Sequence, residues 1–177
     1  MYTGFYIFLG ILSVSLTFNI KTNVTDGIPE QLNVPTRPFK KIGDGYYYIQ
    51  GAKKVNWFAA AQECAERGAE LVDFKTLDEF NILNRYLNDS YTHIMFWTSG
   101  TNLADPKSYV WGDGKPIDLD IWYPGEPNNL NGTENCAELG HDDFPAKAFG
   151  LNDINCLSER LYICKARQPK TVSVVVW

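Results

Sequence analysis

Blocks of lysine and arginine are missing from this 177-residue sequence, which carries a formal net charge of −5 at pH 7. Binding to nucleic acid depends on clustered positive charge, so their absence argues against a nucleic-acid partner. The sequence also has no internal repeat and no low-complexity segment. Hydrophobic residues make up 45% and aromatic residues 14% of the chain. That composition suffices for the core of one ordinary domain with short extensions.

The sequence is poor in cysteine and histidine, and no Cys-x-x-Cys pair occurs. The two histidines, His93 and His141, are isolated, which disfavours a cysteine–histidine metal site. An even number of cysteines is typical of disulfide-bonded proteins from an oxidising compartment. The four cysteines are Cys64, Cys136, Cys156 and Cys164. They can pair in three ways, and the sequence alone does not choose among them.

Motifs of catalysis are also lacking. Ser99 does not stand in the Gly-x-Ser-x-Gly setting of an esterase, and residues 112–115 lack the spacing of a phosphate-binding loop. Glu126 and Glu134 could be imagined as the carboxylate pair of a glycosidase, but no base that would activate a water is identifiable. The sequence therefore predicts a protein that is not an enzyme.

An apolar run covers residues 2–18. Its length matches the apolar region of a signal peptide with its flanks and is short for a membrane span. No positive charge precedes it, and Leu16-Thr17-Phe18 is a poor cleavage site. We expect residues 1–18 to be the signal peptide of a secreted, extracellular protein without a transmembrane span in its mature form. An uncleaved short anchor is the alternative. Glycosylation sequons at Asn23, Asn88 and Asn131 fit the same compartment.

The two ends of the chain differ from its middle. Residues 19–38 are polar and turn-prone, with no apolar period, which predicts a flexible N-terminal arm with no core of its own. Folded sequence is expected to begin at Phe39. The C-terminal tail, residues 168–177, ends in a valine-rich run and Trp177. The tail could add to a sheet edge, meet a partner chain or be disordered, and the sequence leaves these open.

Two helices are predicted in the first half of the domain. Asn56 can cap a helix that ends at Gly68, and residues 76–79 form a capping box for a second helix. Leu77, Phe80, Leu83 and Leu87 are expected on the buried face of that second helix.

Short strands are predicted at 45–49, 94–100, 136–139, 148–151 and 161–164, with 94–100 at the centre. Residues 101–131 are crowded with Gly, Pro, Asp and Asn, but the aromatic residues among them predict an ordered, packed loop. These aromatic residues are Tyr109, Trp111, Trp122 and Tyr123. Two helices followed by short antiparallel strands and long loops give an α+β fold.

Residues 122–156 gather oxygen-bearing side chains on loops beside two cysteines. The gathered residues are Glu126, Asn128, Glu134, Asn152 and Asp153. Carboxylate and carboxamide oxygens suit a hard divalent cation, and Ca²⁺ takes about six to eight such ligands.

Residues 39–167 resemble a C-type lectin domain, and the flanking sequence looks most like secreted insect lectins. The resemblance rests on the first helix with Cys64, on the Phe-Trp-Thr-Ser-Gly segment at 96–100, on the Trp-x-x-Gly-Glu-Pro-Asn motif at 122–128, and on three later cysteines in register. It implies a C-type lectin-like fold with two helices, short antiparallel sheets and a long calcium-binding loop region. It also implies the disulfides Cys64–Cys164 and Cys136–Cys156.

By the same resemblance, the five gathered residues are the ligands of a Ca²⁺ that binds sugar, and Pro127 follows a cis peptide bond. Two adjacent sugar hydroxyls would complete the coordination while bonding to the Asn amides and Glu carboxylates. Glu-Pro-Asn goes with mannose, fucose or N-acetylglucosamine in this family. The expected partners are glycans on microbial or host cell surfaces. The alternatives are a galactose-binding lectin and a calcium-independent module that binds protein.

Several features depart from the family pattern or add to it. Leu151 stands where the family usually has Trp, and residues 141–145 look like an insertion. His141, Asp142 and Asp143 could bind a second metal, although a solvated polar loop is the favoured reading. Asp105 or Asn129 could hold an auxiliary calcium.

Two further expectations concern access and assembly. A glycan on Asn131 would sit beside the sugar site, so we expect this sequon to be unused or to restrict the site to small terminal sugars. A homo-oligomer would raise avidity, but no coiled coil is present in the sequence to provide it.

Overall fold

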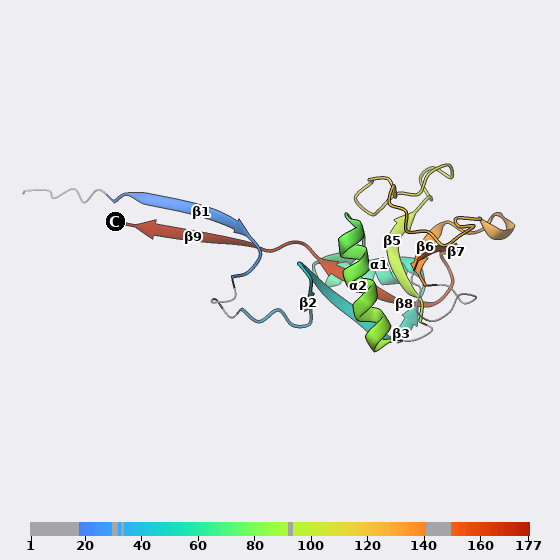
Figure 1. Cartoon of the computed structure of the whole chain (residues 1–177), viewed down its shortest axis with the longest axis horizontal. Coiled ribbons are helices and arrows are strands. Elements are labelled where there is room, and N and C mark those ends of the chain that lie inside the picture. Colours follow the sequence, from blue (N-terminus) through green and yellow to red (C-terminus); the bar gives the residue numbers. More distant parts are fainter. Residues whose placement is uncertain (1–17, 30–31, 33, 92–93, 141–149) are drawn as a thin grey trace, which may run out of the picture.

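The computed structural model describes residues 18–29, 32, 34–91, 94–140 and 150–177 (Figure 1). His93, residues 141–145 and all of the predicted signal peptide except Phe18 therefore lie outside the described residues. Among the helices that are described, none combines the length and the apolar character needed to cross a membrane.

One seven-stranded sheet forms the centre of the domain. Its strands are β2 (Lys40–Ile42), β3 (Gly45–Val55), β4 (Ala69–Leu71), β5 (Phe96–Thr101), β6 (Cys136–Leu139), β7 (Leu151–Ile154) and β8 (Arg160–Ala166). The order is β2-β3-β8-β5-β6-β7, with β4 also paired to β8. All pairs are antiparallel except β5 with β8. The predicted central position of β5 is confirmed, and so is the α+β fold.

Both predicted helices are present with their predicted caps. Helix α1 (Trp57–Glu66) begins after Asn56, whose side chain accepts a hydrogen bond from the Ala59 N–H. Helix α2 (Leu77–Ser90) begins after Thr76, whose side chain accepts from the Glu79 N–H. Asparagine and threonine stabilise helix starts in this way because the first N–H groups have no partner inside the helix.

The buried face of α2 is formed by Phe80, Leu83, Asn84 and Leu87. The prediction for Leu77 is wrong, since this residue is 46% exposed. Leu77 is the first residue of the helix, and the apolar spacing does not reveal that the core begins one turn later.

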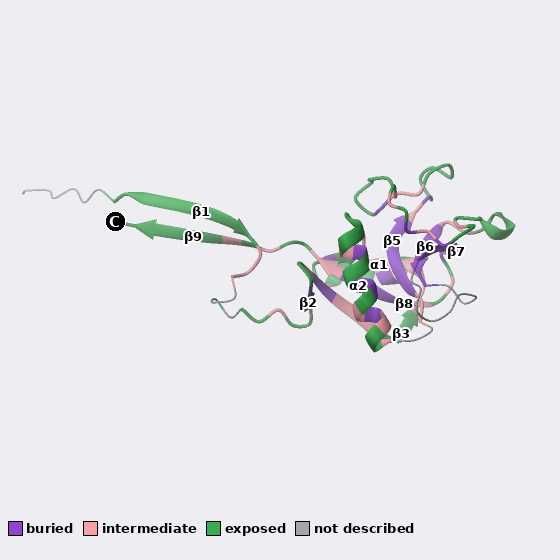
Figure 2. Ribbon diagram, viewed as in Figure 1, coloured by how far each residue is buried: buried purple, intermediate pink, exposed green. Residues whose placement is uncertain are grey.

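The two disulfides join Cys64 to Cys164 and Cys136 to Cys156. The first connects α1 to β8, and the second connects β6 to the segment after β7. All four cysteines are buried, and Figure 2 shows the neighbouring central strand β5 in the purple of buried residues. The pairing implied by the resemblance is therefore confirmed.

The long loop between β5 and β6 is packed against the sheet, as its aromatic residues predicted. Trp111 and Tyr123 are buried. The backbone of Leu151 in β7 bonds to this loop twice, because its N–H donates to Ile121 O and its carbonyl accepts from Tyr123 N–H. These bonds place the residues after Tyr123 beside the end of β7.

A second sheet lies apart from the domain, at the left of Figure 1. It consists of β1 (Ile20–Asp26) and β9 (Lys170–Val176), paired antiparallel over seven residues of each strand. The N-terminal arm thus contains a strand that its composition does not predict, because the partner strand lies about 150 residues away in the sequence. Of the three outcomes open for the tail, strand pairing is observed, with the arm rather than with the central sheet.

Removal of this two-stranded sheet should leave the domain stable. Every residue of β1 is exposed, so a chain without residues 1–28 and 169–177 should lose less than about 1 kcal/mol of unfolding free energy. The corresponding fall in melting temperature is about 2–4 °C. Thermal unfolding followed by circular dichroism measures it.

Leu83→Ala in the full chain is the positive control. Leu83 is fully buried, and the cavity should cost about 2–5 kcal/mol. A truncated chain that unfolds as readily as Leu83→Ala would show that the domain depends on β1 and β9.

Candidate functional site

The five oxygen-bearing residues come from three places that meet at one end of the domain. Glu126 and Asn128 follow Tyr123 in the long loop, and Glu134 precedes β6. Asn152 and Asp153 lie in β7, where they pair with Glu138 and Ala137 of β6. Strand pairing therefore fixes the last two residues, whereas the loop must be held in place by side chains.

Asp153 is the residue that holds the loop. It is fully buried, and its Oδ1 accepts a hydrogen bond from the Asn128 N–H at 2.9 Å. Its Oδ2 accepts from the Asn129 N–H at 3.0 Å and lies 3.0 Å from the Tyr109 hydroxyl. A buried carboxylate needs such donors, since burial without them is costly. The loop thus stays close to β7 by satisfying this charge.

Glu126 lies next to Asp153 and bonds to Asn128. The Asn128 side-chain amide donates to Glu126 Oε1 at 2.7 Å, and its backbone N–H donates to Oε2 at 3.1 Å. Burial, followed by the nearby Asp153 carboxylate, raises the pKa of Glu126. The expected cis peptide bond before Pro127 is confirmed.

Glu134 closes the other end of the loop. Its Oε2 accepts from the Leu130 N–H at 2.8 Å, and its own N–H donates to the Asn129 side-chain oxygen at 3.1 Å. Asn129 and Asn131 both have positive φ, 45° and 57°, a backbone region that asparagine tolerates better than most residues. Residues 128–134 therefore form a short closed turn.

Tyr109 contacts the Asp153 carboxylate and was not predicted as a site residue. Burial raises its pKa, and so do the charges of Asp153, Glu134 and Glu126. The hydroxyl lies 3.1 Å from the Glu134 carbonyl, and the ring packs edge-on against Trp122 with 4.9 Å between ring centroids. The Tyr109 hydroxyl therefore links the Asp153 carboxylate of β7 to the backbone of Glu134 before β6.

Asn152 is held from behind by a second unpredicted residue. The Glu138 side chain is 2% exposed and bonds to Arg160 Nε through Oε2 at 2.5 Å. Its Oε1 accepts from the Asn152 amide at 3.0 Å. The bond to Glu138 uses one of the two hydrogens of the Asn152 amide, so the second hydrogen and the carbonyl oxygen are the groups that could serve a ligand. The available signal was the composition of residues 136–139, Cys-Ala-Glu-Leu. Glu138 is the charged residue in an otherwise apolar predicted strand, which is buried in the structure.

The five residues do not yet form a metal cage. Within the part of the chain that the structure describes, no group of three or more His, Cys, Asp or Glu side chains is arranged to hold a metal ion. Asp153 and Glu126 oxygens accept hydrogen bonds from the loop instead. Ion binding would have to exchange some of these hydrogen bonds for coordination.

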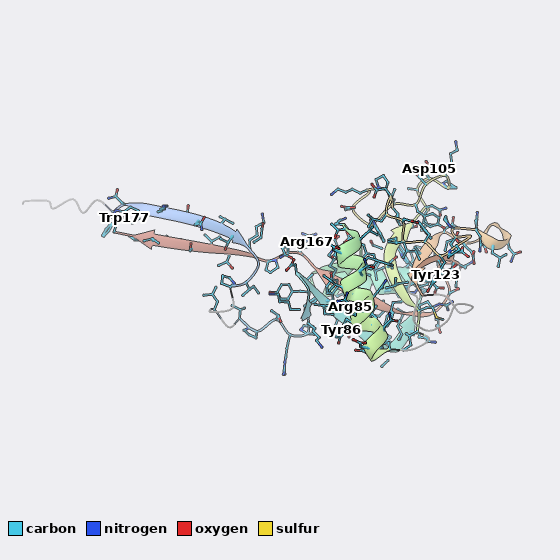
Figure 3. All side chains as sticks on the ribbon, in the orientation of Figure 1. Arg85, Tyr86, Asp105, Tyr123, Arg167 and Trp177 are labelled. Atoms are coloured by element: carbon cyan, nitrogen blue, oxygen red, sulfur yellow. A yellow bond between two sulfur atoms is a disulfide. The ribbon has the colours of Figure 1, made fainter. Side chains whose placement is uncertain are left out.

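The remaining predicted metal ligands and glycosylation sites lie in several separate parts of the chain. Asp105, on the outer loop in Figure 3, accepts from the Lys107 N–H within a turn, whereas Asn129 belongs to the loop bound by Asp153. His141, Asp142 and Asp143 lie outside the described residues. Among the sequons, Asn23 and Asn131 are exposed and Asn88 is half-buried in α2.

This chain matches a family model, a relative by sequence and two solved structures. The model of the lectin C-type domain matches residues 53–166. C-type lectin 37Da of Drosophila melanogaster is 35% identical over 161 residues, which cover 88% of this chain and 86% of that protein.

Two solved structures resemble the fold, each at 22% identity over 77% of this chain. The carbohydrate-recognition domain of the human scavenger receptor C-type lectin is matched over 100% of its length with a TM-score of 0.64. A calcium-independent type II antifreeze protein is matched over 96% of its length with a TM-score of 0.62.

The prediction that the chain is not an enzyme is confirmed by its family, whose domains are non-enzymatic. The buried carboxylate that anchors the loop, the two disulfides and the family match together lead to one assignment. The chain belongs to the C-type lectin family of carbohydrate-binding domains.

Proposed function

We propose that this protein is a calcium-dependent lectin for mannose-type sugars, with Glu126, Asn128, Glu134, Asn152 and Asp153 as calcium ligands and sugar contacts. The observation that carries the proposal is that the Glu126 and Asp153 carboxylates lie together, since both accept a hydrogen bond from the Asn128 backbone N–H. Like charges repel, so their gathering favours a cation at this place.

The donor set suits calcium in its chemistry. Three carboxylates and two carboxamides supply hard oxygen ligands, and none of the five residues offers sulfur or imidazole. The fold by itself does not imply calcium, since the matched antifreeze protein is calcium-independent. The argument for calcium therefore rests on the residues of this chain.

Each side chain has a separate part in binding. Glu126, Glu134 and Asp153 supply negative charge, while Asn128 and Asn152 supply amide donors beside carbonyl acceptors. Bound Ca²⁺ would offset two of the three negative charges and coordinate two neighbouring sugar hydroxyls. The Asn amides donate to those hydroxyls, and the Glu oxygens accept from them. The Asn128–Glu126 bond at 2.7 Å shows that a donor and an acceptor already lie side by side.

The Glu-Pro-Asn order favours mannose, fucose or N-acetylglucosamine over galactose. Glu126 as the acceptor and Asn128 as the donor would fit two sugar hydroxyls in one relative orientation. Exchange of the acceptor and the donor would fit two hydroxyls in a different relative orientation. We further propose secretion and recognition of glycans on microbial or host cell surfaces. A calcium-independent module that binds protein is the second candidate, supported by the calcium-independent relative.

Removal of calcium should abolish sugar binding. Purified protein should bind immobilised mannan in about 1–5 mM Ca²⁺, a range that fills even weak extracellular calcium sites. It should release the mannan in excess EGTA and rebind when calcium is restored. Surface plasmon resonance measures all three steps. Mannan binding that survives EGTA would contradict the calcium dependence, whereas no mannan binding in calcium would favour the second candidate.

Exchange of the donor and acceptor should change the sugar preference. Glu126→Gln with Asn128→Asp should raise the ratio of galactose to mannose affinity at least about tenfold, because one misplaced hydrogen bond to a charged group costs about 1.5–3 kcal/mol. Competition of free sugars for the immobilised mannan, or for a galactose resin, gives the ratio.

Glu66→Gln with Asn81→Asp is the matched control, since it makes the same changes at two exposed helix positions. This control should keep the wild-type preference. An unchanged preference in the site variant would count against the proposed hydrogen bonds.

Loss of the Glu138 carboxylate should weaken calcium binding without direct contact to the ion. Glu138→Gln leaves Arg160 without its buried partner and loosens Asn152, so calcium affinity should fall about 10–100-fold. Isothermal titration calorimetry gives the affinity, and circular dichroism in EGTA shows whether the fold persists.

Glu70→Gln is the control, because Glu70 is exposed and bonds to Arg167 outside the site. Glu138→Gln that folds and binds calcium as tightly as Glu70→Gln would remove Glu138 from the site.

A further inference from the structure

The two-stranded sheet of β1 and β9 has two unlike faces. Paired residues of antiparallel strands share a face, and successive residues alternate between faces. One face therefore carries Ile20 with Val176, Thr22 with Val174, and Val24 with Val172. We call these six residues the valine face.

The opposite face is polar apart from Val175. It carries Lys21 with Val175, Asn23 with Ser173, and Thr25 with Thr171. Asn23 is the acceptor of a glycosylation sequon, so a glycan there would extend from the polar face. The valine face would stay open.

The valine face is exposed along its whole length. Relative exposure is 67% for Ile20, 57% for Val24, and 54–60% for Val172, Val174 and Val176. Figure 2 shows both strands extending from the domain as exposed residues, and Figure 3 shows Trp177 at the far end. A lone two-stranded sheet is marginally stable in water unless its apolar face packs against another surface.

We propose that the valine face packs against the valine face of a second copy of this chain. Two-fold symmetry brings the same surface from both copies together, and two sheets stack face to face at about 10 Å. Charge permits this contact, because Asp26 and Lys170, at the domain end of the face, pair with each other at 3.8 Å. Identical faces therefore meet without net repulsion.

The area of the face sets the expected strength of the dimer. Seven residues at about 3.3 Å each give a face about 23 Å long, and two strands give a width of about 10 Å. The dimer would bury about 500 Å² in total, below the ~1,200 Å² of stable complexes. We therefore expect a weak, reversible dimer, whose benefit is avidity for surfaces that carry many glycans. That benefit rests on the proposed function, whereas the dimer itself does not.

Val174 and Val175 provide a matched test. They are neighbours in β9, both are 56% exposed, and they lie on opposite faces. Sedimentation equilibrium in EGTA, from about 10 µM to about 1 mM protein, covers the range of weak association. Wild type and Val175→Lys should dimerise alike, and Val174→Lys should weaken the dimer at least about tenfold. EGTA keeps the result independent of the calcium site.

Two results would overturn the proposal. The wild type could remain monomeric at every concentration, with or without binding to lipid vesicles. The two variants could weaken association equally, which would indicate pairing through strand edges.

Sugar binding then tests whether the dimer raises avidity for a surface that carries many glycans. Val174→Lys should bind immobilised mannan more weakly than Val175→Lys, while both bind free mannose with equal affinity in calcium. Wild type that dimerises but binds no mannan would contradict the proposed function and leave the dimer standing.

Discussion

Burial of the Asp153 carboxylate is the constraint on which the loop end of this domain depends. A charge that is fully buried must be satisfied, and two of its donors are backbone N–H groups of the long loop. The loop has little regular structure of its own. Its position therefore follows from this one side chain, from the Leu151 backbone bonds and from the Cys136–Cys156 disulfide. Loss of Asp153 would release Asn128 and Asn129 together.

In the proposed calcium site, the same carboxylate would connect loop position to ligand binding. In the structure, Asp153 and Glu126 accept hydrogen bonds from loop groups, and these oxygens are the ones that calcium would require. Hydrogen bonding and coordination therefore compete for the same atoms.

Sequence patterns predicted the features that depend on neighbours in the chain. Asn56 and Thr76 cap helices through bonds to residues three positions later, so both caps could be read directly. The disulfide pairing and the cis bond before Pro127 came from the family resemblance, which carries information that spacing alone lacks. The aromatic residues of the long loop correctly indicated packing, because large apolar rings are seldom left in water.

Features that depend on distant pairing were missed. Strand β1 reads as a polar arm, because its valine-rich partner β9 is joined to it only through the fold. Glu138 stands in a predicted strand, but spacing in the sequence does not reveal that Arg160 and Asn152 lie beside it. The central claim, that the five oxygen-bearing residues hold one calcium ion, is tested most directly by calorimetric titration of correctly oxidised protein with Ca²⁺. The account predicts heat of binding at millimolar calcium or below, with the heat lost in Glu126→Gln. No heat of binding from the wild type would contradict it.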